Sequence, residues 1–395
     1  MQKMYFDARD IFRSTRIALS LQRIWLQFVG LAIGYLGYLM LTYISFMTAG
    51  LELVGVWKKH GLLPCIFSEP HTWIATMVYS IGVLWLLVVY LIATTAVARA
   101  TYMTSKGNHF YTWRDALKFS FRKISSIILS PMAILILIGL FVSGGAVVGW
   151  LGKIPFIGEF GITIFTLFWF IASLLIVFFG IVLIVALIQA PAILATTDDD
   201  AFEVVFQSFS LVWAQPWRLI LYEAISAVMA VVGFVVLATI SKNAYIVMDR
   251  IFSNTMGEDF INISAQGMYI LSVWLTHSMN WVHSAFHDIS DMFYFSREYD
   301  PLQLAIGYHY AASYIFALWM LFIGGLILSY GIASFNVGNT LTYLVLRKKK
   351  DDENLLERKD KEEEEDEEEE SSEEKKEGNA DESKGTTEDE EKEEA

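Results

Sequence analysis

Six stretches of this chain consist almost wholly of apolar residues: 24–47, 73–98, 131–150, 160–189, 217–240 and 305–346. A helix of roughly 20 apolar residues spans the hydrocarbon core of a bilayer, where the backbone must satisfy its own hydrogen bonds. Hydrophobic residues make up 55 % of the chain and charged residues 18 %. The sequence therefore predicts an all-α fold, a polytopic transmembrane helical bundle of six spans.

The segment in front of the fifth span has the pattern of an amphipathic helix. Acidic residues at 199, 200 and 203 crowd its start, where the helix dipole favours negative charge. Its aromatic residues recur on one helical face: Phe202, Phe206, Phe209 and Trp213. Pro216 then suits the first turn of the next helix. The pattern predicts a helix that lies in the membrane surface and leads into a spanning helix.

This unit recurs earlier in the chain. A shift of 85 positions places Pro216 on Pro131, which we expect to open the third span. The second stripe consists of Trp113, Leu117, Phe121 and Ile124. A fainter copy precedes the first span. We therefore expect three repeats, about 8–98, 112–190 and 199–346, each a cytoplasmic interfacial helix followed by two spans, with an outer loop over 241–304 in the third. The alternative is that any amphipathic segment before a membrane helix shows this pattern.

The acidity of the chain is confined to its C-terminal end. The formal net charge is −14, but 25 of the 43 acidic residues and only 7 of the 29 basic residues lie in 351–395. This segment has almost no apolar residue after Leu356. We expect a transmembrane domain over 1–350 and a disordered acidic tail over 351–395. The tail is either a solvated extension or a docking segment for a basic protein partner.

Basic residues beside the spans predict the orientation of the protein. They are Arg9, Arg13, Arg16 and Arg23 before the first span, Arg99, Lys106, Arg114, Lys118, Arg122 and Lys123 between the second and third, and 347–350 after the sixth. Six spans place both termini on one side, so we expect cytoplasmic termini in a bacterial or archaeal plasma membrane. Asp7 and Asp10 interrupt the N-terminus, which indicates a retained anchor and not a cleaved signal peptide. The single cysteine, Cys65, excludes an intrachain disulfide.

Few polar groups lie within the predicted spans. Glu223 falls about two turns into the fifth span, and Asn336 and Asn339 fall in the sixth. An intramembrane carboxylate is a candidate functional group, whereas the asparagines favour hydrogen bonds between helices. Pairs of glycines also lie within spans: Gly30 and Gly34, Gly145 and Gly149, and Gly324 and Gly325. They predict close helix packing within the bundle or, as the alternative, contacts in a homo-oligomer.

Lys118 and Arg122 lie one helical turn apart, away from the aromatic stripe of the second surface helix. This placement is typical of an interfacial helix that meets the head groups of anionic lipids. The two residues could therefore bind lipid head groups, or they could serve only to anchor the helix.

The predicted outer loop contains the one constellation that could bind a metal ion. His283, His287 and Asp291 fall at i, i+4 and i+8, and His277 and Asp288 lie nearby. Two histidines one turn apart plus a carboxylate can ligate zinc or a similar ion. No glutamate stands between them as in zinc proteases, and an interfacial amphipathic helix explains the same residues.

The region 189–223 resembles a known family. Its matching residues are Ala190-Pro191-Ala192, Ala201-Phe202, Gln207-Ser208-Phe209, Leu211 and Trp217-Arg218. They look like a bacterial and archaeal family of six-span membrane proteins of unknown function, related to the membrane domain of some glycerophosphodiester phosphodiesterases. Asp198, Asp199 and Asp200 depart from the lone glutamate and glycine usual there, and the loop over 241–304 is longer than expected. The soluble phosphodiesterase domain is absent from this sequence, so the resemblance implies no catalytic residues.

Three functional hypotheses follow. The first is a non-catalytic membrane scaffold or accessory protein whose partners are the lipid bilayer and anionic lipids. The second is a transporter or channel for a small solute or lipid, with Glu223, Asn336 or Asn339 lining a cavity. The third is an outer-face metal-binding protein or enzyme. No catalytic motif, cofactor-binding motif or nucleic-acid-binding pattern is recognised, and the first hypothesis is preferred because anchoring features are numerous.

Overall fold

The computed structural model describes residues 4–62, 64, 72–285 and 307–358. Within these ranges the chain is helical, with no strand. Six helices are long and apolar enough to cross a membrane: α3 (Leu21–Thr48), α5 (Trp73–Lys106), α7 (Ile124–Leu151), α9 (Thr166–Thr197), α11 (Pro216–Met256) and α14 (Tyr308–Asp351). The predicted class, an all-α multi-pass membrane protein with six spans, is confirmed.

The helices follow one order three times along the chain. A short helix or helix pair precedes each pair of spans: α1 (Ala8–Ile11) and α2 (Ser14–Ala18), then α6 (Trp113–Arg122), then α10 (Ala201–Ala214). Another helix connects the two spans of each pair: α4 (Leu53–His60), α8 (Ile157–Ile164) and α12 (Glu258–Ala285). The spans pack within each pair as α3 on α5, α7 on α9 and α11 on α14.

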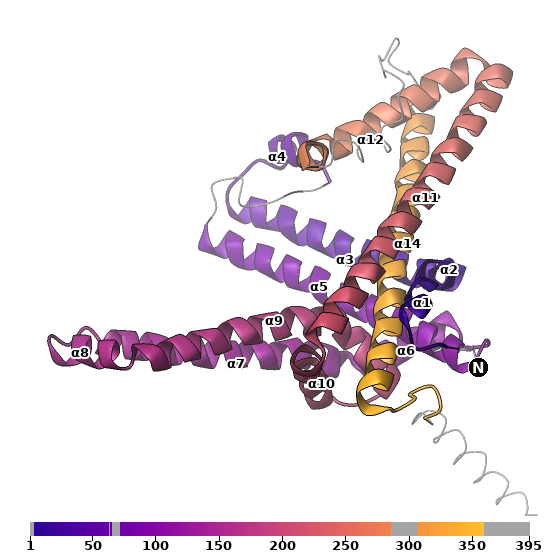
Figure 1. Cartoon of the computed structure of the whole chain (residues 1–395). Helices are drawn as coiled ribbons and strands as arrows, with labels where there is room; N and C mark the ends of the chain where they lie inside the picture. The colour runs from indigo at the N-terminus through magenta and orange to yellow at the C-terminus, as the bar shows by residue number, and fades with distance from the viewer. Residues whose placement is uncertain (1–3, 63, 65–71, 286–306, 359–395) are drawn as a thin grey trace, which may run out of the picture.

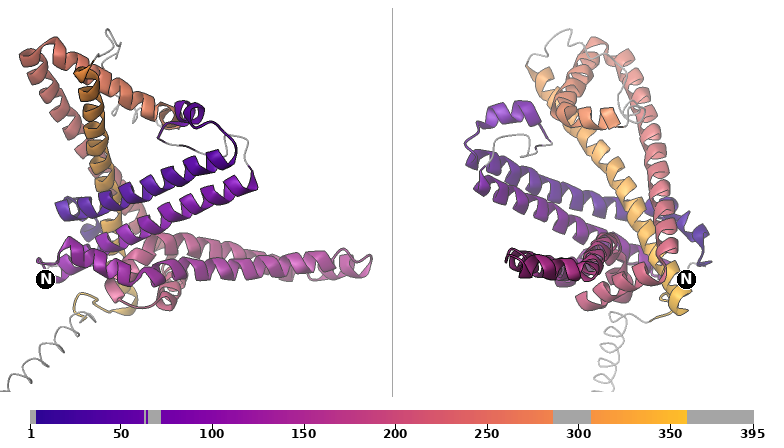
Figure 2. Two further views of the ribbon diagram at one scale, coloured as in Figure 1. Left: turned by 180° about the vertical axis from the view of Figure 1, so that it is seen from behind. Right: turned by 60° about the vertical axis from the view of Figure 1, so that its left-hand side comes forward.

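The three pairs diverge from a common junction (Figure 1). The leading helices α1, α2, α6 and α10 lie around this junction, and the connecting helices α4, α8 and α12 lie at the far ends of the pairs (Figures 1 and 2). Burial follows the same geometry. The segments 91–103 of α5, 189–197 of α9 and 336–346 of α14 are buried on all sides, whereas much of α7 and of the distal part of α9 is exposed.

Two predicted boundaries differ from the structure. Pro131 does not open the third span, because α7 begins at Ile124 and carries this proline in its interior, whereas Pro216 is the first residue of α11. The segment predicted as an outer loop, 241–304, is helical in its described part up to residue 285, since α11 continues to Met256 and α12 follows after Gly257. Residues 286–306 lie outside the described ranges.

The start of the predicted tail packs against the membrane domain. Leu355 and Leu356 are buried, and the Tyr102 hydroxyl donates a hydrogen bond of 2.8 Å to the Leu355 carbonyl. Near the other end of the chain, Asp7 accepts a hydrogen bond of 3.2 Å from Lys349 Nζ in the last turn of α14. Two apolar side chains explain why the polar tail begins with an ordered segment. The rest of the tail, 359–395, lies outside the described residues.

The predicted glycine pairs differ in their surroundings. Gly30 and Gly34 of α3 face α5: a Cβ at Gly30 would overlap Ala93 Cβ, and a Cβ at Gly34 would come within 3.2 Å of the Leu86 side chain. A Cβ at Gly325 would approach the Phe28 ring. In contrast, a Cβ added at Gly145 or Gly149 of α7 would point into open space, with no neighbouring side chain within 4 Å. Close packing explains the first pair, and a homo-oligomer contact at the second stays a prediction.

Candidate functional site

The intramembrane carboxylate is held by two amides from other helices. Glu223 of α11 accepts a hydrogen bond from the side chain of Gln189, near the end of α9. The Asn339 amide of α14, oriented with its nitrogen toward the carboxylate, donates to Glu223 Oε2 at 3.0 Å. Gln189 and Asn339 are buried, and Glu223 is partly buried. Three helices that belong to two different pairs are therefore joined at one carboxylate.

The other predicted asparagine connects α14 to the first pair. Asn336 Nδ2 donates a hydrogen bond of 3.0 Å to Gln27 Oε1 of α3. Nearer the C-terminal end of α14, the hydroxyl of Thr342 lies 3.3 Å from the hydroxyl of Ser226 on α11. We call this set the polar junction: Gln27, Gln189, Glu223, Ser226, Asn336, Asn339 and Thr342. Its members come from α3, α9, α11 and α14, so the polar junction links all three pairs of spans.

A second group of polar contacts lies where α5, α6 and α9 meet. Arg99 is fully buried and donates to the Ala195 carbonyl at 2.9 Å, with its guanidinium 4.3 Å from the centre of the Phe119 ring. A cation over an aromatic face is attracted by the ring quadrupole, most strongly when water is excluded. Arg99 therefore ties the second span to both the leading helix α6 and the fourth span.

An ion pair fixes the end of α9. Asp198 terminates this helix in a left-handed conformation, with φ of 54°, and is 2 % exposed. Its carboxylate lies 2.7 Å from Lys123 Nζ, and the same amine donates to the Asp198 carbonyl at 2.8 Å. Arg122 lies farther away, at 3.6 Å. Asp198 thus connects the end of α9 to the start of α7, a contact that the sequence did not predict.

Most aromatic residues of the predicted stripes on α6 and α10 are exposed. Trp113 and Phe121 of α6 are exposed, as are Phe202, Phe206 and Trp213 of α10. The opposite side of α10, at Val204, Gln207, Ser208 and Leu211, is buried. This face of α10 packs on the protein while most of the aromatic face remains available to lipid, as expected for an interfacial helix.

The predicted head-group residues have different environments. Lys118 is exposed on α6, consistent with the prediction. Arg122 forms a 3.6 Å ion pair with Asp198, and its guanidinium lies 5.7 Å from the centre of the Phe119 ring. Contact of either residue with lipid stays a prediction.

The predicted metal constellation is outside what the structure describes. His287 and Asp291 lie among residues 286–306, and the side chain of His283 in α12 is likewise not described. Within the described part of the chain, no group of three His, Cys, Asp or Glu side chains is placed to hold a metal ion. The hypothesis of an outer-face metal site stays a prediction.

The polar junction is chemically suited to holding helices together. It has one carboxylate, four amide side chains and two hydroxyls, and contains neither a histidine nor a cysteine. Its side chains donate and accept hydrogen bonds across helix boundaries, where lipid offers no hydrogen-bond partner. Gln27 and Gln189 were missed in the sequence because glutamine near a span end resembles a boundary residue. Searching every span for amides as well as charges would have found both.

No protein-family model, no curated protein and no solved structure matches the chain. The resemblance of 189–223 to the six-span membrane family therefore stays a prediction, and the function is argued from the geometry alone.

Proposed function

We propose that this multi-pass membrane protein is a non-catalytic scaffold or accessory protein, with both termini in the cytoplasm, that holds three diverging helix pairs in a fixed arrangement and organises the lipids or proteins between them. The observation that carries this proposal is the polar junction. Its side chains at membrane depth form contacts between helices of different pairs, as in Gln27 with Asn336 and Glu223 with Gln189 and Asn339.

The exposed surfaces of the pairs support the same proposal. Beyond the junction, apolar side chains such as Leu167 and Ile184 of α9 and Val228 of α11 are more than half exposed. Diverging pairs can cross one bilayer only if they tilt in different directions. Apolar flanks of this extent need lipid or another membrane protein to cover them. A scaffold provides such flanks in a fixed relative position.

The transporter hypothesis makes a different demand on the same residues. A carrier must expose its polar site alternately to the two sides of the membrane, which requires the helix pairs to move against each other. Breaking and remaking the contacts of Glu223 would then be part of the cycle. The scaffold proposal instead expects the pairs to keep one arrangement whatever the state of Glu223.

Pulsed electron paramagnetic resonance can separate the two proposals. Spin labels would be attached to cysteines that replace Lys153, at the exposed far end of the second pair, and Arg250, exposed on the distal part of α11. The native Cys65 would be replaced by alanine. In lipid nanodiscs the scaffold proposal expects one narrow distance distribution. The Glu223→Gln variant should keep that distribution, because an amide retains a side chain of the same size.

A second measurement uses the same proteins in liposomes loaded with a pH-sensitive dye. The scaffold proposal expects proton flux no faster than in protein-free liposomes for both the wild type and Glu223→Gln. Two distance populations that exchange with pH, together with proton flux lost in Glu223→Gln, would contradict the scaffold and establish a transporter.

A further inference from the structure

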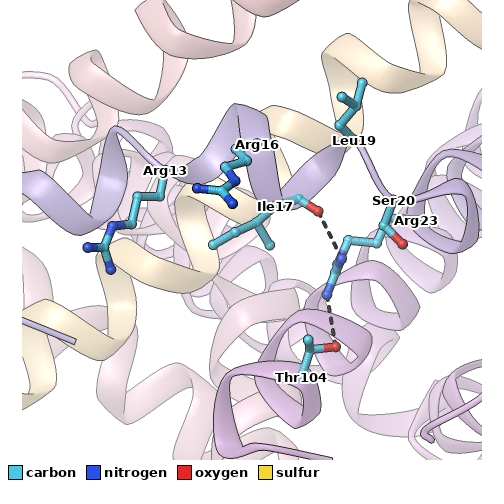
Figure 3. Close-up of a pocket in the computed structure, with 7 residues that line it drawn as sticks. All are labelled: Arg13, Arg16, Ile17, Leu19, Ser20, Arg23 and Thr104. Carbon is cyan, nitrogen blue, oxygen red and sulfur yellow. Dashed lines mark hydrogen bonds between the residues drawn. The ribbon is translucent and has the colours of Figure 1, made fainter. Parts of the chain in front are cut away.

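A basic pocket lies beside the N-terminal helices, away from the polar junction. Its volume is about 570 Å³, within the range typical of small-molecule sites. Figure 3 shows Arg13 and Arg16 to one side of Ile17 and Arg23 to the other. The lining residues are Arg13, Arg16, Ile17, Leu19, Ser20, Arg23 and Thr104. Three arginines and two hydroxyls, with no carboxylate in the lining, favour an anion.

Arg23 is the buried member of the three. It is 4 % exposed and donates to four neutral oxygens: Ile17 O at 2.8 Å, Thr104 Oγ1 at 2.9 Å, Thr101 Oγ1 at 3.1 Å and Ala100 O at 3.3 Å. These bonds orient the guanidinium and use four of its five N–H donors. No carboxylate within the described residues forms an ion pair with Arg23. Burying a cation without a counter-ion is costly, so an anion in the pocket would be stabilised.

The other two arginines are more accessible. Arg16 is exposed and has neither a hydrogen bond nor an ion pair within the described part of the chain. Arg13 lies 3.6 Å from Asp10 and 5.3 Å from the centre of the Tyr5 ring. The lining of the pocket thus holds three guanidinium groups and no carboxylate. Planar guanidinium groups match the oxygens of a phosphate with paired hydrogen bonds.

The position of the pocket in the membrane selects the source of the phosphate. Arg23 lies in the first turn of α3, and Thr104 lies in the last turn of α5. Both helices are candidate spans, so the pocket lies where the hydrocarbon core gives way to the head groups. Leu19 lines the pocket and Leu21 follows it, with exposed fractions of 58 % and 79 %. These side chains would contact acyl chains.

We propose that this pocket binds the phosphate of an anionic phospholipid, with Arg16 and Arg13 contacting the phosphate oxygens and Arg23 supplying a preorganised positive charge. The site differs from the head-group contacts predicted at Lys118 and Arg122. It also does not depend on the scaffold proposal, because the polar junction shares no residue with it.

The test titrates purified full-length protein in a non-ionic detergent with phosphatidylglycerol, phosphatidylcholine or inorganic phosphate, and counts bound molecules by native mass spectrometry. Wild-type protein should retain one phosphatidylglycerol in preference to phosphatidylcholine. Arg16→Gln should weaken that binding about tenfold, because an accessible charge-assisted contact is lost. Arg114→Gln, which removes an exposed arginine from α6, should leave it within about twofold.

The variants are chosen to keep the fold intact, since Arg16 is exposed and has no partner within the described residues. Unchanged melting temperatures would confirm that the fold is kept. Equal loss of phosphatidylglycerol in Arg16→Gln and Arg114→Gln would overturn the site, since only the general surface charge would matter. Binding of inorganic phosphate without any preference between the two lipids would overturn the assignment to a phospholipid. The distance measurement between the helix pairs would be unaffected by either failure.

Discussion

Replacing Asp198 with asparagine should lower the free energy of unfolding by about 3 kcal/mol. The substitution keeps the size of the side chain and suits the left-handed conformation that Asp198 adopts at the end of α9. It removes the charge that lies 2.7 Å from Lys123 Nζ and leaves that amine, only 14 % exposed, without its carboxylate. Equilibrium unfolding in mixed micelles would measure the change.

Asp352 offers a matched control for this experiment. It also terminates a spanning helix, α14, with φ of 54°, and it pairs with Lys348 at 2.9 Å, but its side chain is 94 % exposed. Water solvates both partners, and an exposed pair of this kind contributes about 0–1 kcal/mol. Asp352→Asn should therefore leave stability nearly unchanged. Equal losses in the two variants would mean that burial does not determine the strength of the Asp198 contact.

Replacing Gly30 with alanine should destabilise the protein by about 2 kcal/mol. A Cβ at this position would overlap Ala93 Cβ and come within 3.5 Å of the Ala93 Cα atom. Both atoms belong to Ala93 on the surface of α5, so α3 and α5 must separate to accommodate one methyl group. The loss should appear as a lower melting temperature of the purified protein.

Two further variants identify the cause of that loss. Ala93→Gly in the Gly30→Ala background removes the overlapping methyl group and should restore most of the stability. Gly145→Ala on α7, where the new Cβ would point into open space, should be neutral or slightly stabilising because alanine favours the helix. A similar loss at Gly30 and Gly145, or no recovery with Ala93→Gly, would show that helix packing at Gly30 is not the reason.

The spans were predictable because each depends on one property, a long run of apolar residues. The leading helices were also predictable, since the aromatic stripe of α10 recurs at helical spacing and three of its four residues are exposed in the structure. The boundary at Pro131 was not. A proline is equally compatible with the first turn of a helix and with the interior of a membrane helix, where neighbouring groups compensate for the lost hydrogen bond.

The partners within the candidate site could not be predicted in the same way. Glu223 and Asn339 stand out as polar groups in apolar segments, yet nothing local indicates that they meet each other or that Gln189 joins them. Such contacts depend on how three helices rotate about their axes. Arg23 illustrates the same limit. Its charge was used to predict orientation, whereas its hydrogen bonds to α5 place it in a pocket.

The arrangement of the leading helices on one side of the membrane is tested most directly by the accessibility of single cysteines. In cells carrying a chain with Cys65 replaced by alanine, cysteines at Lys118, Asp200 and Lys153 would be treated with a membrane-impermeant thiol reagent before and after lysis. Cysteines at Lys118 and Asp200 should react only after lysis, and a cysteine at Lys153, at the far end of α7, should react in intact cells. Labelling of the cysteine at position 118 or 200 in intact cells, or labelling of all three cysteines from the same side, would contradict the arrangement. The leading helices of the three helix pairs would then not lie on the cytoplasmic surface.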